Sequence, residues 1–381
     1  MDGMREKRRA RLVEMTQKKG VEAAIITSWP NIFYLSGLRP IGALTNSWQP
    51  FPLLVSAQGA MTFVCTRAFS KMMEIEYPDF SSVPFAEDHL IWPFRSIFEA
   101  MQEGLRSLGI KGKEGTRIGI ETDRMPASYK DELEKLFPKA EFVNISSDVT
   151  SLRYVKDESE LAALREAARI TNEVGEEVIH DYLRPGMTEY ELERAFIKVM
   201  AEKGAAPAFV QIFSGERSCY QNVAPTGRII KRGDTVLMDY GVRCESGYCS
   251  DITRAAVIGK PSKAQLEISK AVKEIILRTL EYIKPGRTAA DIDKYVELKF
   301  RELGYGDYYI HRTGHNVGLE PSEPFAISRA NETDVVQPNM CFAIEPGIYI
   351  DGVGIRLEDN IITTETGIEN LTSLPYDIIS V

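Results

Sequence analysis

Short apolar runs alternate with amphipathic segments in the first part of the chain. Residues 4–19 have helical periodicity, and the apolar run that follows predicts a buried strand at 22–27. Two further strands are predicted on either side of a turn at Gln58-Gly59. Beyond them, the pattern predicts helices near 93–108 and 127–136 and strands at 117–121 and 140–146. Such alternation is typical of an α/β domain with a largely parallel sheet.

Long helices replace this alternation after residue 154. A charged, alanine-rich segment has helical periodicity from about 157 to 183, and the strands beyond it come in pairs. We therefore predict an α/β N-terminal domain over 1–154 and an α+β C-terminal domain over 155–381. The 381 residues are enough for two domains that each bury a core.

An internal repeat organises the second domain. Residues 183–204 and 283–304 match at a constant offset of 100. Each segment has Pro-Gly, a threonine that can cap a helix, an acidic residue three positions later, an apolar helical stripe and a glycine that can end the helix. A constant offset over 22 residues indicates an ancient duplication.

Two pairs of acidic residues interrupt apolar strands in the two repeats. Asp239 and Asp251 lie 12 residues apart, and about 106 residues later Glu345 and Glu358 lie 13 apart. Strands are unfavourable places for Asp, and a buried carboxylate without a partner is costly. Nearby arginines offer one or two ion pairs. Two Asp and two Glu related by duplication instead indicate a cage for divalent metal.

Histidine is the ligand that this cage lacks, and the chain has four. His89 falls in the first domain and His180 on an amphipathic helix, where surface or packing roles are the simpler interpretation. His311 and His315 lie between the two acid pairs, in the glycine-containing segment HRTGHNVGL. We therefore predict His315 as a metal ligand and His311 as its neighbour in the site.

Composition narrows the functional classes. A net charge of −9 and a pI near 5.3 argue against nucleic acid as a partner, because phosphate binding needs a basic surface. No apolar run approaches the roughly 18 residues of a membrane span, and the basic N-terminal segment lacks the apolar stretch of a signal peptide. The five cysteines have neither zinc-site nor disulfide-framework spacing. We predict a cytoplasmic protein that binds neither nucleic acid nor membrane.

The segments DYG, GYCSDITR, GHNVG, AIEPGIY and IRLED, in this order and spacing, resemble the pita-bread metallopeptidases. That group includes Xaa-Pro dipeptidases (prolidases), aminopeptidases P and methionine aminopeptidases, with creatinase as a relative. The resemblance covers residues 155–381, and the α/β domain before it is similar to the N-terminal domain of prolidase and creatinase. It implies a metal-dependent hydrolase, and it favours cleavage of the Xaa-Pro bond of dipeptides or short peptides.

Carried over to this chain, the resemblance implies five ligands for two divalent ions: Asp239, Asp251, His315, Glu345 and Glu358. Asp251 and Glu358 would bridge the ions. Paired metals of this kind sit roughly 3.5–4 Å apart, activate water near neutral pH and hold the substrate carbonyl. The mostly hard ligands suit Mn²⁺, with Co²⁺ or Zn²⁺ as alternatives.

Three residues of this site receive catalytic roles. Glu345 is the predicted proton acceptor from the attacking water. Arg356 is predicted to orient the carboxylate of Glu358, because the two residues lie two positions apart on one strand. His311 is predicted to act in catalysis and to contact the substrate.

Two positions depart from the peptidase pattern. A histidine 17 residues before the first metal Asp is replaced by Asn222, and a histidine in a GLE-x-His-Glu segment is replaced by Ser322. In the family these histidines contact substrate and move protons, whereas Asn and Ser do not titrate near neutrality but can donate hydrogen bonds. We predict that both residues bind substrate. Hydrolysis of a non-peptide C–N bond, as in a creatinase-like or cyclic amidine substrate, is the alternative, and a binding protein without turnover is a further one.

The resemblance also implies an assembly. Prolidase-like relatives are dimers in which the N-terminal domain closes over the partner's active site. The stretch at 37–51 has the aromatic and arginine content for such a lid, so we predict a homodimer. The alternative is that Trp48 and Phe51 belong to the core of their own domain.

Overall fold

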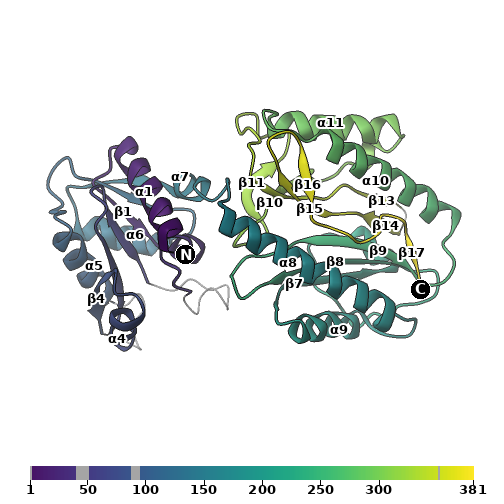
Figure 1. Ribbon diagram of the computed structural model, residues 1–381, viewed down its shortest axis with the longest axis horizontal. Helices are drawn as coiled ribbons and strands as arrows, with labels where there is room; N and C mark the ends of the chain where they lie inside the picture. Colours follow the sequence, from purple (N-terminus) through teal and green to yellow (C-terminus); the bar gives the residue numbers. More distant parts are fainter. Residues whose placement is uncertain (1, 40–50, 87–94, 351) are drawn as a thin grey trace. The chain divides into compact units, whose positions relative to one another are not determined.

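The computed structural model describes residues 2–39, 51–86, 95–350 and 352–381. The chain divides into two compact units, Met1–Arg153 and Tyr154–Val381, which run from purple to blue and from teal to yellow in Figure 1. Within the described ranges there is no helix with the length and apolar character that a membrane span requires.

The strands of the N-terminal unit form one mixed sheet. In chain order they are β1 (Ala23–Ile26), β2 (Leu53–Ser56), β3 (Met61–Thr66), β4 (Ser81–Phe85), β5 (Arg117–Ile120) and β6 (Glu141–Asn144). Their order in the sheet is β4-β3-β2-β1-β5-β6, in which β2 pairs antiparallel with β1 and β3, and the other pairs are parallel. The sheet is less parallel than the pattern predicted, because the tight turn at Gln58-Gly59 permits only an antiparallel pair.

Amphipathic helices pack on this sheet. They are α1 (Asp2–Lys19), α2 (Trp29–Ser36), α4 (Arg67–Glu76), α5 (Arg95–Ser107), α6 (Ala127–Leu136) and α7 (Ser146–Ser151). The core between α5, α6 and the strands contains Ile25, Leu54, Ile97, Ile118 and Leu133, all buried. Removal of such side chains from water is the main stabilising term of the unit.

The stretch predicted as a lid is only partly described. Phe51 is buried, and its ring meets that of Phe69 edge to face with centroids 4.9 Å apart. Trp48 and the other residues of 40–50 lie outside the described residues, and so does His89. Phe51 therefore belongs to the core of the N-terminal unit, and the lid stays a prediction.

Four long helices appear in the described part of the C-terminal unit: α8 (Glu158–Glu177), α9 (Glu189–Glu202), α10 (Lys263–Tyr282) and α11 (Ala289–Glu302). A π-helical turn, Val178–Tyr182, extends α8 and carries the exposed His180. In Figure 1, α10 and α11 border one side of the strands and α9 borders the other. The apolar faces of α8 and α9 pack on the first sheet of this unit, and those of α10 and α11 pack on the second.

The strands of this unit form two sheets and a hairpin. The first sheet contains β7 (Ala206–Ser214), β8 (Thr235–Arg243), β9 (Ile252–Val257) and β17 (Ile379–Ser380), in the order β17-β9-β8-β7. The second contains β10 (Gly314–Asn316), β11 (Glu323–Ile327), β12 (Cys341–Ile344), β15 (Asp359–Thr363) and β16 (Ile368–Asn370), in the order β11-β10-β12-β15-β16. The hairpin joins β13 (Gly347–Ile350) to β14 (Val353–Arg356).

The repeated helices begin in the same way. Thr188 caps α9 by accepting from the Glu191 N–H, and the Glu191 carboxylate accepts in return from the Thr188 N–H. Thr288 and Asp291 form the same reciprocal pair at the start of α11. These capping boxes satisfy backbone N–H groups that a helix start leaves without partners. The predicted duplication is therefore visible as repeated local geometry.

One of the four acidic residues lies inside a strand as the pattern predicted, and the other three lie at strand ends or between strands. Asp239 lies inside β8, but Asp251 precedes β9, Glu345 follows β12 and Glu358 lies between β14 and β15. The second repeat has four strands where two were expected, because Pro346 cannot donate to the β12 ladder and the chain turns into the β13–β14 hairpin. A bridge between Thr253 and Glu358 joins the two repeats beside the acids.

Candidate metal centre

A cavity of about 660 Å³ lies in the C-terminal unit where the two repeats meet. Its wall contains all nine residues that the sequence singled out: Asn222, Asp239, Asp251, His311, His315, Ser322, Glu345, Arg356 and Glu358. The other lining residues are Phe209, Gln211, Gln221, Arg312 and Pro321. Segments more than 100 residues apart therefore converge on one site.

The candidate ligand atoms approach one another closely in this cavity. One ligand atom each from Asp251, His315 and Glu358 lies within 4.8 Å of the others. His315 Nε2 lies 3.6 Å from Asp251 Oδ2 and 3.6 Å from Glu345 Oε1. These separations exceed hydrogen-bond length and leave room for a cation among the donor atoms.

The imidazole of His315 is oriented for ligation. Its Nδ1 lies 3.2 Å from the carbonyl oxygen of Asn316 and donates a hydrogen bond to it, so the lone pair is on Nε2. Burial lowers the pKa of His315, which keeps the ring neutral. A neutral histidine with its second N–H held by a carbonyl is the common arrangement of a metal ligand.

The carboxylates of the site are buried and repel one another. Burial, and then the charges of Glu358, Asp239 and Glu345, raise the pKa of Asp251 well above its usual range. Burial and then the charge of Glu345 do the same to the pKa of Glu358. The pKa of Asp239 is raised to about 6 by burial, against the opposing charge of Arg356. A cation among these groups would relieve the cost of their ionisation.

Asp239 supplies a direct test of whether the residues fit a metal. Its Oδ2 accepts a hydrogen bond from Arg356, whereas its Oδ1 is buried and accepts none from any described residue. A buried carboxylate oxygen without a donor is rare and indicates an electrostatic partner. Four carboxylates and a neutral imidazole are donors of the kind that divalent ions select, so the residues fit the predicted metals.

Arg356 is placed differently from the prediction. It donates to Asp239, to Thr253 Oγ1 over 3.1 Å and to the Tyr349 hydroxyl over 3.2 Å. Glu358 receives its hydrogen bond from Thr253 Oγ1, over 2.6 Å. Arg356 therefore reaches Glu358 through Thr253, because β14 ends at Arg356 and the two residues do not share one strand. The motif GYCSDITR contained Thr253, but its role was missed.

Arg254 does not pair with any acid of the cavity. Its Nη2 donates to Asp359 Oδ1 over 2.8 Å, and its Nη1 donates to the carbonyl oxygen of Glu358 over 2.9 Å. Both side chains of this ion pair are almost completely buried. The pair therefore fixes the backbone beside Glu358 and leaves the carboxylate of Glu358 directed at the cavity.

Tyr349 holds His311, a contact that sequence reasoning missed. His311 Nδ1 donates to the carbonyl oxygen of Arg312 over 2.8 Å, so its Nε2 accepts from the Tyr349 hydroxyl over 3.0 Å. Burial lowers the pKa of His311, which favours this neutral form. Tyr349 stands in the quoted segment AIEPGIY, but only the folded hairpin brings it to a histidine 38 residues away.

Asn222 and Ser322 are exposed to the cavity from two different loops. Asn222 has a left-handed backbone with φ 52°, a conformation that Asn tolerates better than most residues. Ser322 Oγ accepts from Arg312 Nη2 over 3.1 Å. Gln211 and Gln221, which the sequence did not mark, each bring a buried side-chain atom without a hydrogen-bond partner among the described residues.

Comparisons with known proteins extend over both units. Residues 162–365 match the model of metallopeptidase family M24, and residues 8–155 match that of the creatinase/prolidase N-terminal domain. A Xaa-Pro dipeptidase of Pyrococcus horikoshii is 32% identical over 386 residues, which cover 100% of both chains.

Solved structures give the same result. A Xaa-Pro dipeptidase from Bacillus anthracis aligns with a TM-score of 0.87 at 29% identity and covers 99% of this chain and 100% of its own. An X-Pro aminopeptidase from Thermotoga maritima aligns with a TM-score of 0.84 at 29% identity, covering 98% and 99%. The predicted resemblance and the predicted fold, an α/β N-terminal domain before a pita-bread domain, are confirmed.

Proposed function

The chain belongs to metallopeptidase family M24, and on that premise we propose that it hydrolyses the Xaa-Pro bond of dipeptides or short peptides. One observation carries the proposal: four carboxylates and an imidazole from both repeats line a single cavity together with hydrogen-bonding side chains. In this proposal residues 1–154 form the creatinase/prolidase-like N-terminal domain and residues 155–381 form the catalytic domain.

Two divalent ions would be held by the side chains of Asp239, Asp251, His315, Glu345 and Glu358, with Asp251 and Glu358 shared between them. When bound, such ions lower the pKa of water and polarise a carbonyl group. The oxygen-rich donor set favours Mn²⁺, with Co²⁺ or Zn²⁺ as alternatives. The partnerless Oδ1 of Asp239 supports this assignment.

Glu345 is the proposed proton acceptor. Its Oε1 faces the Nε2 of His315 over 3.6 Å, so it borders the same space as the other ligand atoms. There it takes a proton from the water whose oxygen attacks the carbonyl carbon of the substrate. The proton then moves to the proline nitrogen as the C–N bond breaks.

Neutral side chains would position the substrate. The amide of Asn222 and the hydroxyl of Ser322 can donate hydrogen bonds to the carbonyl oxygen as negative charge develops on it. Both ring nitrogens of His311 are engaged, one by the Arg312 carbonyl oxygen and the other by the Tyr349 hydroxyl, so we propose that this fixed ring contacts the substrate and acts in catalysis. The Tyr349 hydroxyl fixes the orientation of that ring.

Arg312 is the proposed contact for the free carboxylate of a dipeptide. Of the two arginines on the described cavity wall, Arg356 is buried and bound to Asp239, whereas Arg312 is exposed beside Ser322. An exposed guanidinium can pair with a carboxylate through two hydrogen bonds. This arrangement favours a dipeptide, which ends in a carboxylate next to the scissile bond, over a longer peptide.

A second candidate function follows from the two positions of the cavity wall that differ from the peptidase pattern. Asn222 and Ser322 stand where the peptidase pattern has histidines, and neither side chain moves a proton near neutral pH. A non-peptide C–N substrate, such as a creatinase-like or cyclic amidine compound, would use the same metal ligands. Its leaving nitrogen would have to accept its proton from Glu345.

Three further assignments belong to the proposal: manganese as the native metal, a cytoplasmic location and a homodimer. The dimer rests on the resemblance to prolidase-like relatives, and residues 40–50 of the expected lid lie outside the described ranges. Light scattering at working concentration tests it, and a mass of 42.8 kDa, that of one chain, would contradict it.

Proline release from a panel of Xaa-Pro dipeptides tests the main proposal. The purified protein is titrated with Mn²⁺ and compared with chelator-treated protein. Metal-dependent release is expected. Bound metal without any release would reject Xaa-Pro hydrolysis and favour the non-peptide alternative.

A further inference from the structure

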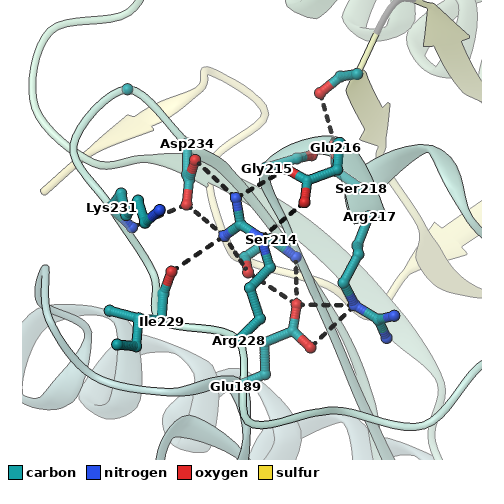
Figure 2. Close-up of polar contacts among 12 residues, drawn as sticks. Glu189, Ser214, Gly215, Glu216, Arg217, Ser218, Arg228, Ile229, Lys231 and Asp234 are labelled. Atoms are coloured by element: carbon teal, nitrogen blue, oxygen red, sulfur yellow. Dashed lines mark hydrogen bonds and ion pairs between the residues drawn. The ribbon is translucent and has the colours of Figure 1, made fainter.

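A buried carboxylate outside the cavity organises the loop that carries Asn222. Glu189, the first residue of α9, is fully buried, and Figure 2 shows dashed contacts from its carboxylate to Ser214 and Arg217 within a polar cluster. The loop is residues 215–226, which begin with a 3-10 helix at Gly215–Cys219 and continue through Gln221 and Asn222. Both of these last residues line the cavity.

The two carboxylate oxygens of Glu189 each hold one end of this loop. Oε1 accepts from Ser214 N over 2.9 Å and from Ser214 Oγ over 2.8 Å, where β7 ends and the loop begins. Oε2 accepts from Thr226 N over 2.9 Å and from Thr226 Oγ1 over 2.7 Å, where the loop ends. One rigid side chain therefore fixes the separation of the two ends.

Arg217 links the same carboxylate to the middle of the loop. Its Nε lies 3.1 Å from Glu189 Oε2, and its Nη2 donates to the carbonyl oxygen of Ala224 over 2.9 Å. The ion pair joins a completely buried carboxylate to a side chain that is 19% exposed. A charge-assisted contact of this kind is stronger than a neutral hydrogen bond, so the loop is braced between its ends as well.

The loop is also pressed against the hairpin that carries Arg356. Ser218 Oγ accepts from Gly354 N over 2.7 Å, two residues before Arg356. A Cβ at position 354 would meet the carbonyl oxygen of Ser218 at 1.8 Å, so only glycine permits this approach. The loop that contains Asn222 is therefore held both by its contact with the hairpin and by its hydrogen bonds to Glu189.

We propose that Glu189 is a positioning residue for substrate binding: it sets the place of Asn222 at the cavity wall without touching the substrate. The proposal rests on the proposed function of Asn222. It does not involve the metal ligands, because the described contacts of the Glu189 carboxylate are to Ser214, Arg217 and Thr226. A displacement of about 1 Å in such a support can cost on the order of 100-fold in rate.

The test compares E189Q with E191Q, a matched carboxylate-to-amide change on the same helix that affects only the exposed capping box. In E189Q an amide NH₂ replaces one carboxylate oxygen. The NH₂ group cannot accept the hydrogen bonds that the N–H and hydroxyl groups at one end of the loop donate. We expect kcat/KM for a Xaa-Pro dipeptide to fall about 10- to 100-fold with Mn²⁺ affinity unchanged, and E191Q to keep wild-type kinetics. T226V removes the hydroxyl that donates to Glu189 and accepts from the Arg228 N–H, and it should give a smaller fall with a normal fold.

A double-mutant cycle with N222A separates positioning from general damage. If Glu189 acts through Asn222, E189Q should cost less than about 3-fold in the N222A background, because the placed group is already gone. Full additivity of the two changes would overturn the proposal. So would E189Q kinetics within 2-fold of wild type, or a loss of Mn²⁺ that accounts for the lost activity.

Hydrogen exchange keeps this test independent of the reaction. Amides of residues 215–226 should exchange faster in E189Q than in wild type, while those of β8 and β9 keep their rates. If the wild-type protein cleaves no Xaa-Pro dipeptide, the proposed function fails, and this measurement alone decides the positioning claim. Unchanged exchange in 215–226 would then overturn it.

Discussion

In the first repeat of the C-terminal unit, the Gly186 N–H donates to the carbonyl of Ile230 over 2.8 Å. In the second, the Gly286 N–H donates to the carbonyl of Val336 over the same distance. Both glycines have left-handed φ angles, 92° and 89°, and each precedes a capped helix. The shared turn, cap and helix place both acid pairs at one cavity, so the duplicated parts supply the cage.

The repeats differ in what their buried helix carboxylates hold. Glu189 in the first repeat holds the ends of the loop with Asn222, on the side of the cavity assigned to substrate. Asp293 in the second accepts from Thr313 N over 3.0 Å and from Thr313 Oγ1 over 2.7 Å. The Thr313 carbonyl in turn accepts from Glu345 N over 2.9 Å. One repeat therefore braces the wall that we assign to substrate, and the other braces Glu345, a proposed metal ligand.

The largest expected effect comes from removing a ligand of either repeat. D251A in the first and E358Q in the second should each abolish bound metal and lower activity by at least about 10⁴-fold, because the proposed ions need ligands from both. Metal analysis after dialysis against Mn²⁺, with E191Q as control, measures this. Tight metal binding by either variant would show that one repeat alone forms a sufficient site.

The next effect concerns the substrate wall of the first repeat. N222H should raise kcat/KM for Xaa-Pro dipeptides, by up to about 100-fold, because a titrating imidazole restores a proton-transfer group. Proline release across pH measures it, and a new dependence near the pKa of a histidine should accompany the gain. An unchanged rate would direct the search toward another substrate class.

In the second repeat, D293N should weaken metal binding. Weakening the support of Thr313 should lower Mn²⁺ affinity about 10- to 100-fold, as is usual when the partners that orient metal ligands are changed. E189Q, changed in the matching helix of the other repeat, should leave that affinity within about 3-fold. Calorimetric titration of both variants is the measurement. Equal effects would remove the functional distinction between the repeats.

The smallest effect is expected from R312Q. Loss of one exposed guanidinium should raise KM for a Xaa-Pro dipeptide about 10-fold or less, and should change little for the corresponding dipeptide amide, which has no carboxylate. R312K is the matched control that keeps the charge. An equal rise for both substrates would assign Arg312 to the structure of the 311–322 segment instead.

The sequence predicted which side chains line the cavity better than it predicted the residues that support them. Asp239 and Glu345 stand out because carboxylates are unfavourable beside apolar strands, and the constant repeat offset links the two pairs. Nothing local marks Tyr349 or Thr253, since their roles depend on partners 38 and 105 positions away. The same holds for Glu189, which reads as an ordinary acid in the first turn of a helix and is revealed only by its burial.

Strand limits were predicted well where apolar runs end at turns, and poorly in the second acid pair. There, CFAIEPGIYIDGVGIRLEDN reads as two strands, but the chain inserts the β13–β14 hairpin. The hairpin packs against the loop at Ser218, whose carbonyl oxygen lies beside Gly354. Long-range packing of this kind is not encoded in the local pattern.

The spread of the ligand set along the chain has a consequence for synthesis. The proposed ligands run from Asp239 in the first repeat to Glu358 in the second. Contacts over such separations form late, because the closure of long loops is entropically costly. A chain made only as far as residue 300 would hold Asp239 and Asp251 but not the three proposed ligands of the second repeat, so the proposed ions could bind only after both repeats have been made and folded.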